Sequence, residues 1–225
     1  METFTPNPEL LRSLGKLTRG LSALFWGLPA ALIVCAETAR IEFLKPVGIV
    51  PAVVVNALLL YGLWQMSDFQ KQERPWHNAL DRAKLLGLVN LGLCPFLFWF
   101  NRMPEHFFFR AGILLFVLSA LLFLFTLNIV LNQLGAMLPD ETLRHETRQF
   151  TLMNRWLLVL WLIFVFAMIV VSQFLPLHFN PRLSFGLQRM GIAVFLFLGL
   201  SPLAVTMALI WKTKEVIFDS VFCAR

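Results

Sequence analysis

The sequence predicts an all-α fold: a polytopic membrane protein built as a bundle of six transmembrane helices, with an N-terminal amphipathic helix on the membrane surface. Hydrophobic residues make up 58% of the 225 residues and charged residues only 14%, whereas soluble domains carry about 25% charged residues. Six apolar runs approach or reach the roughly 17–25 residues that a helix needs to cross the hydrocarbon core. Charged side chains and histidines lie outside all six runs. This composition excludes a soluble domain and a disordered chain.

The first 19 residues predict the surface helix. Asn7, Pro8 and Glu9 are typical of a helix start, with a capping side chain, a proline in the first turn and an acid near the positive end of the helix dipole. From Leu10 to Leu21, leucines recur on one helical face while the basic residues lie elsewhere. We therefore expect residues 1–19 to lie on the inner membrane surface before the chain enters the bilayer.

The six predicted spans form one domain, residues 20–211, which is followed by a cytoplasmic tail at residues 212–225. Tryptophans at the span ends support these limits, because an amphipathic ring prefers the headgroup level; they are Trp64, Trp99, Trp156 and Trp211. Neighbouring spans should pair as three antiparallel hairpins. The spans cover residues 20–36, 46–66, 85–100, 111–134, 156–177 and 190–211.

Lys and Arg are distributed unevenly between the two ends of the predicted bundle. The N-terminus, the second and fourth loops and the C-terminus hold 13 of the 19 basic residues, and the other three loops hold 6. Basic residues are enriched in cytoplasmic loops. The sequence thus predicts a multi-pass protein of the cell inner (plasma) membrane with both termini in the cytoplasm, and an even number of spans agrees.

Short motifs recur where the predicted spans begin and inside them. Lys45, Arg110 and Arg189 each stand shortly before a Gly-Ile pair, where the cation can reach headgroup phosphate and the glycine lets a neighbouring helix approach. The strings LGLCP and LGLSP form a second echo with a different offset, which favours convergent chemistry over an internal duplication. We expect structural kinks at the prolines within spans: Pro29, Pro51, Pro95 and Pro202.

Polar side chains within the spans are candidates for either helix packing or substrate binding. Asn and Gln at membrane depth more often join helices through hydrogen bonds than bind a substrate. Asn128 and Asn132 share one helical face, and Gln133 follows them directly. The candidate residues are Asn128, Asn132, Gln133, Asn56, Asn90 and Gln173.

No motif in the sequence indicates catalysis, a metal or a cofactor. The spans lack the acidic and basic residues that proton pumps and ion-coupled carriers bury. The three cysteines and four histidines are scattered, so neither a disulfide framework nor a metal site is expected. The net charge of +6 is explained by basic cytoplasmic loops beside anionic lipid, so nucleic acid is not an expected partner.

The fourth loop is the richest soluble segment. Leu138–Phe150 contains a helix start and two arginines, Arg144 and Arg148, spaced by one turn. It is either a solvated connector or a docking helix for a cytoplasmic partner. In the docking interpretation, the contact residues are Leu143, Arg144, Arg148 and Phe150.

These observations favour a non-enzymatic integral membrane subunit of a larger membrane complex, either a scaffold or a permease-type component. Its expected partners are the lipid bilayer and other membrane or cytoplasmic protein subunits. The alternative is a stand-alone carrier or flippase for an apolar or lipid-like substrate, which needs no buried charge. A membrane-embedded enzyme is the minor alternative.

Overall fold

A computed structural model describes residues 8–40, 48–70, 72–103, 105–137, 141–174 and 181–222. These residues form six α-helices, and the predicted all-α fold is confirmed. The helices are α1 (Pro8–Arg40), α2 (Val50–Met66), α3 (Arg74–Arg102), α4 (Phe107–Met137), α5 (Glu141–Phe174) and α6 (Pro181–Phe222).

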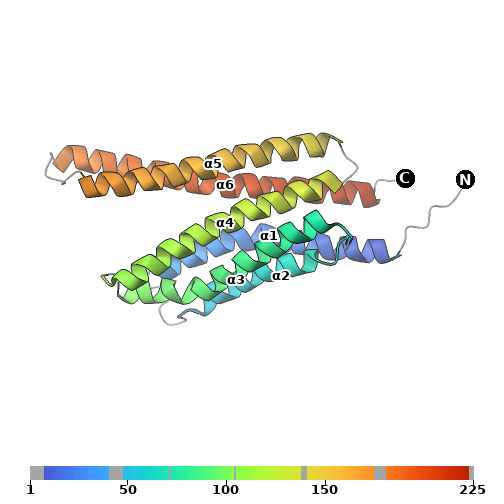
Figure 1. The fold of residues 1–225 in the computed structure, drawn as a ribbon, viewed down its shortest axis with the longest axis horizontal. Coiled ribbons are helices and arrows are strands. Elements are labelled where there is room, and N and C mark those ends of the chain that lie inside the picture. Colours follow the sequence, from blue (N-terminus) through green and yellow to red (C-terminus); the bar gives the residue numbers. More distant parts are fainter. Residues whose placement is uncertain are drawn as a thin grey trace, which may run out of the picture.

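The helices pack as three consecutive hairpins. The most extensive contacts join α1 to α2, α3 to α4 and α5 to α6. Helix α4 lies between the group formed by α1, α2 and α3 and the pair formed by α5 and α6 (Figure 1). The start of α1 and the end of α6 lie at the same end of the bundle, near the end of α4 and the start of α5 (Figure 1).

Three of the described helical segments are long and apolar enough to cross a membrane: Arg12–Ala39, Arg74–Arg102 and Phe107–Met137. Helix α2 is a shorter apolar helix. Large apolar side chains also face outward, with Phe107 82% and Trp156 72% exposed. Extended apolar surface of this kind suits contact with lipid rather than with water.

The predicted separate surface helix is not confirmed. Helix α1 runs from Pro8 to Arg40 without a break at residue 19. Leu17 and Leu21, which belong to the apolar face expected to lie on the membrane, are fully buried in the core of the bundle. The leucine periodicity is therefore satisfied by neighbouring helices, because an amphipathic face can pack on protein as well as on lipid.

The larger hydrophobic core draws buried residues from α1, α2, α3, α4 and α6. It includes Leu63, Trp76, Leu80, Leu131 and Ile210, all fully buried. A smaller, separate cluster joins α1, α2, α3 and α4. Its buried members are Cys35, Ala52, Cys94, Leu97 and Phe116. An ion pair between Lys16 and Asp68 ties α1 to the turn after α2.

Glycines allow close helix approach at two of the hairpins. A Cβ atom on Gly20 would lie 2.6 Å from the carbonyl oxygen of Gly62, so α1 and α2 touch backbone to backbone there. At the start of α4, the ring of Phe96 occupies the space that a side chain on Gly112 would need. Gly48 belongs to the same recurring Gly-Ile motif as Gly112. It has open space around it and a φ of +66°, a conformation that glycine adopts readily.

Three of the four prolines expected to interrupt spans do lie inside helices. They are Pro29 in α1, Pro95 in α3 and Pro202 in α6. The prediction is wrong for Pro51, which occupies the first turn of α2. Proline is tolerated there because the backbone N–H it lacks would have no partner within the helix.

Candidate functional site

A buried polar junction joins α4, α5 and α6. The hydroxyl of Thr206 accepts hydrogen bonds from the Nδ2 atoms of Asn128 and Asn154, each at 3.0 Å. The same hydroxyl donates to the carbonyl oxygen of Pro202 at 2.7 Å. Asn128 and Asn154 are 2% and 0% exposed. One hydroxyl thus uses both its acceptor capacity and its proton to connect three helices.

The junction leaves two buried acceptors unused. Asn128 also donates from Nδ2 to the carbonyl oxygen of Leu124 at 2.7 Å. The Oδ1 atoms of Asn128 and Asn154 have no hydrogen-bond partner among the described residues. A buried carbonyl oxygen without a donor is unfavourable, so the junction contains two unsatisfied acceptors.

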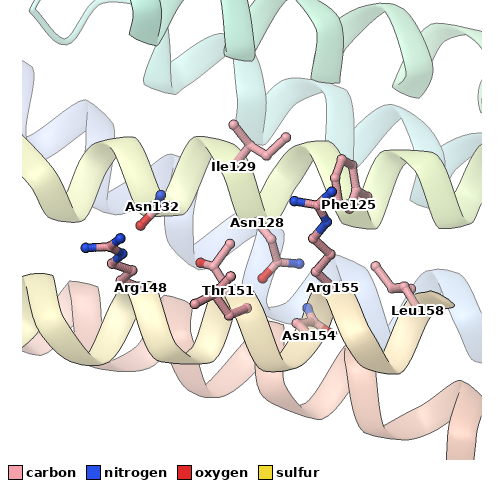
Figure 2. Close-up of a pocket in the computed structure, with 10 residues that line it drawn as sticks. Phe125, Asn128, Ile129, Asn132, Arg148, Thr151, Asn154, Arg155 and Leu158 are labelled. Atoms are coloured by element: carbon pink, nitrogen blue, oxygen red, sulfur yellow. The ribbon is translucent and has the colours of Figure 1, made fainter. Parts of the chain in front are cut away.

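A cleft of about 260 Å³ lies beside this junction, between α4 and α5. Figure 2 shows Arg148 and Arg155 extending from α5 toward α4, with Asn132 and Asn128 on the facing helix. The cleft combines amide, hydroxyl and guanidinium groups with apolar walls. Its lining residues are Phe125, Asn128, Ile129, Asn132, Arg148, Thr151, Leu152, Asn154, Arg155 and Leu158.

The lining of the cleft is positively charged. Arg148 and Arg155 are exposed, and the lining contains no acidic side chain. The two arginines are seven positions apart, which corresponds to about 10 Å along an α-helix and places both on the same face. The cleft therefore presents two guanidinium groups to an anion, with hydrogen-bonding groups between them.

The structure divides the predicted polar residues between several places. Asn128 and Asn132 meet at the cleft as their spacing indicates. The Oε1 atom of Gln133 is buried and has no partner in the part of the chain that the structure describes. Asn56 and Asn90 are buried near the other end of the bundle, and the side chain of Gln173 lies outside the described residues.

Asn56 is surrounded by two cysteines that are far apart in the sequence. Its Nδ2 atom donates to the carbonyl oxygen of Ala52 at 2.9 Å, to Sγ of Cys94 at 3.2 Å and to Sγ of Cys35 at 3.6 Å. The Cys94 thiol in turn donates to the carbonyl oxygen of Asn90 at 3.3 Å. Both thiols are free and buried. This cluster links α1, α2 and α3. Within the described residues, no group of three His, Cys, Asp or Glu side chains is placed to hold a metal ion.

The described part of the predicted docking segment, residues 141–150, is helical. Helix α5 begins at Glu141, and Thr147 is buried against Gly135 of α4. Phe150 is partly buried against the core and Arg148 is exposed at the cleft. The side chains of Leu143 and Arg144 lie outside the described residues, so docking at this segment stays a prediction.

Sequence reasoning missed several residues of the junction and the cleft. Asn154 and Arg155 stand just before the predicted fifth span, and Thr206 lies within the predicted sixth span. Arg148, Thr151 and Arg155 follow the i, i+3, i+7 spacing of one helical face. Arg155 directly precedes the predicted fifth span, so this spacing could have indicated a polar stripe on α5 that reaches the span.

Comparisons of this chain with protein-family models, with curated protein sequences and with solved structures give no match.

Proposed function

We propose that this protein crosses the membrane six times, with both termini on the cytoplasmic side, and works as a non-enzymatic subunit of a larger membrane assembly. The up-and-down order of the six helices supports this topology. So does the unequal distribution of Lys and Arg, since the basic-rich loops and both termini belong to one end of the bundle. Helices α5 and α6 have 34 and 42 residues, ample for a span of about 20 residues.

The use of polar groups between the helices carries the non-enzymatic part of the proposal. Asn128 and Asn154 both donate to the Thr206 hydroxyl, which joins three helices, and Asn56 bonds to Cys35 and Cys94 across three others. Carriers and pumps keep charged or polar groups at membrane depth for their substrates. Here these groups hold the chain's own helices together, as polar residues between membrane helices commonly do.

An exposed apolar face on α5 is the surface that we assign to lipid and neighbouring subunits. Trp156, Leu160 and Ile163 are exposed and spaced to lie on one side of the helix. Such a face can pack against another membrane helix through van der Waals contact. Trp156 directly follows Arg155, which lines the cleft.

Purification of the full chain in a mild neutral detergent tests the proposed role. A subunit brings one or more partner proteins at fixed stoichiometry, whereas an unrelated membrane protein with the same tag does not. Recovery of the chain alone, together with movement of a lipid-like substrate after reconstitution in liposomes, would contradict the subunit proposal. That outcome would favour the second candidate, a stand-alone carrier or flippase, for which the α4–α5 cleft is the supporting observation.

A further inference from the structure

We propose that the cleft between α4 and α5 binds the headgroup of an anionic glycerophospholipid, with a phosphodiester held by Arg148 and Arg155 and a headgroup hydroxyl donating to the unused asparagine oxygens. Four side chains on two helices supply these contacts, and all four line the cleft. This site rests on the proposed function only in that the cleft must lie at the level of the lipid headgroups.

The anionic part of the ligand follows from the charge of the cleft. Arg148 and Arg155 project toward α4 from one face of α5, and the lining has no carboxylate to neutralise them (Figure 2). Guanidinium groups bind phosphate through paired, charge-assisted hydrogen bonds. A ligand that carries an ammonium group beside its phosphate is disfavoured, because two like charges already border the cleft.

The hydroxyl part of the ligand follows from the unused acceptors. The Oδ1 atoms of Asn128 and Asn154 are buried without a partner among the described residues, and both residues line the cleft, so a hydroxyl in the cleft meets these oxygens once the amides turn toward it. A neutral hydroxyl satisfies such an oxygen without adding charge near the arginines. A phosphoglycerol headgroup supplies the phosphodiester and the hydroxyl donors together.

The surroundings of the cleft fit a lipid rather than a free phosphate compound. Trp156, next to Arg155, is exposed as expected for a ring at the headgroup level. Toward the predicted membrane centre, the same helical faces continue with exposed leucines. These are Leu122, one heptad before Ile129 on α4, and Leu162, one heptad after Arg155 on α5. Acyl chains can lie along these leucines while the headgroup occupies the cleft.

Lipid titration of the purified full chain in neutral detergent tests the site, with bound lipid counted by native mass spectrometry. The probes are dioctanoyl phosphatidylglycerol, dioctanoyl phosphatidylmethanol, which lacks the hydroxyls, and dioctanoyl phosphatidylcholine. We expect phosphatidylglycerol to bind more tightly than both. R148Q/R155Q should weaken its binding by about tenfold or more, since both guanidinium groups that hold the phosphate are removed.

The matched control is R74Q/R82Q, which removes the same charge from two exposed arginines of α3. It should change phosphatidylglycerol binding by less than about twofold, because bulk electrostatics between separated charges is screened. Should R148Q/R155Q unfold in detergent, R148Q alone repeats the comparison with R82Q. If R148Q/R155Q and R74Q/R82Q lose phosphatidylglycerol affinity equally, the site is overturned. If phosphatidylmethanol binds the unmodified protein as tightly as phosphatidylglycerol does, the role of the asparagine oxygens is overturned.

Two further arms separate the lipid from other ligands. If sn-glycerol 3-phosphate binds as tightly as phosphatidylglycerol, a soluble phosphate compound is the ligand and the lipid assignment is overturned. If R148Q/R155Q releases a co-purifying protein and leaves lipid binding unchanged, the cleft is a protein-docking surface instead. Binding in detergent needs neither the six-span topology nor a partner, so its failure is distinguishable from failure of the proposed function.

Discussion

Thr206 receives amide donors from two different helices, so one hydroxyl determines the polar contact between α4, α5 and α6. Replacement by valine keeps the shape of the side chain and removes the oxygen. The donors of Asn128 and Asn154 then lose a buried acceptor. We expect T206V to lower the free energy of unfolding by about 1–2 kcal/mol, the range for such contacts, measured by thermal unfolding in neutral detergent.

Thr126 provides the matched control for that substitution. It is also a helical threonine in a predicted span, but its hydroxyl bonds only to the carbonyl oxygens of Leu122 and Phe123 in its own helix. T126V should therefore change stability by less than about 0.5 kcal/mol. Equal destabilisation by T126V and T206V would mean that the junction adds nothing beyond local bonding within one helix.

Single residues also mark the limit of what the sequence could predict about the site. The i, i+4 pair Asn128 and Asn132 was correctly placed on one face, because helical periodicity is a local property. The hydrogen bonds of Thr206 with Asn128 and Asn154, and of Asn56 with Cys35 and Cys94, join residues 21 to 78 positions apart. Such contacts depend on how helices pack, which one chain's periodicity does not specify.

Between elements, the hairpin of α1 and α2 depends on two facing glycines. A methyl group on Gly20 would meet the backbone oxygen of Gly62 at 2.6 Å, and neither backbone can move aside without separating the helices. We expect G20A to destabilise the protein by about 1–3 kcal/mol, the range for overpacking a tight contact, in the same thermal unfolding measurement.

Gly15 in the same helix is the control, because nothing lies within 4 Å of the Cβ that alanine would add. Alanine is favoured over glycine inside a helix by about 1 kcal/mol, so G15A should leave stability unchanged or raise it. If G15A and G20A both raise stability, the close approach of α1 and α2 is absent in the membrane.

Helix lengths were predicted less well than helix positions. Each of the six apolar runs corresponds to one helix, because long apolar segments must form helices in lipid. Helix α2, Val50–Met66, is shorter than its predicted run, whereas the other five helices extend beyond theirs. Helices α1, α5 and α6 include charged turns that the sequence predicts to lie in a surface helix, a loop and a tail. Hydropathy identifies only the part of a helix that meets hydrocarbon, and α-helical hydrogen bonding continues past it.

At the scale of the whole molecule, the same chemistry accounts for the buried and the exposed surfaces. Apolar side chains fill two interior clusters and also cover the outside, as Phe107 and Trp156 illustrate. Polar groups are concentrated where helices meet and at the cleft bordered by Arg148 and Arg155. This distribution is the one expected when lipid surrounds the bundle and polar groups must find partners within it.

Reporter fusions test the six-span topology, on which the proposed role depends. Fusions after Lys71, Pro139 and Arg225 should be active only with a reporter that works in the cytoplasm. Fusions after Pro104 and Phe179 should be active only with a reporter that works after export. The account predicts this strict alternation along the chain, and an export-dependent reporter that is active after Lys71 or Arg225 would contradict it.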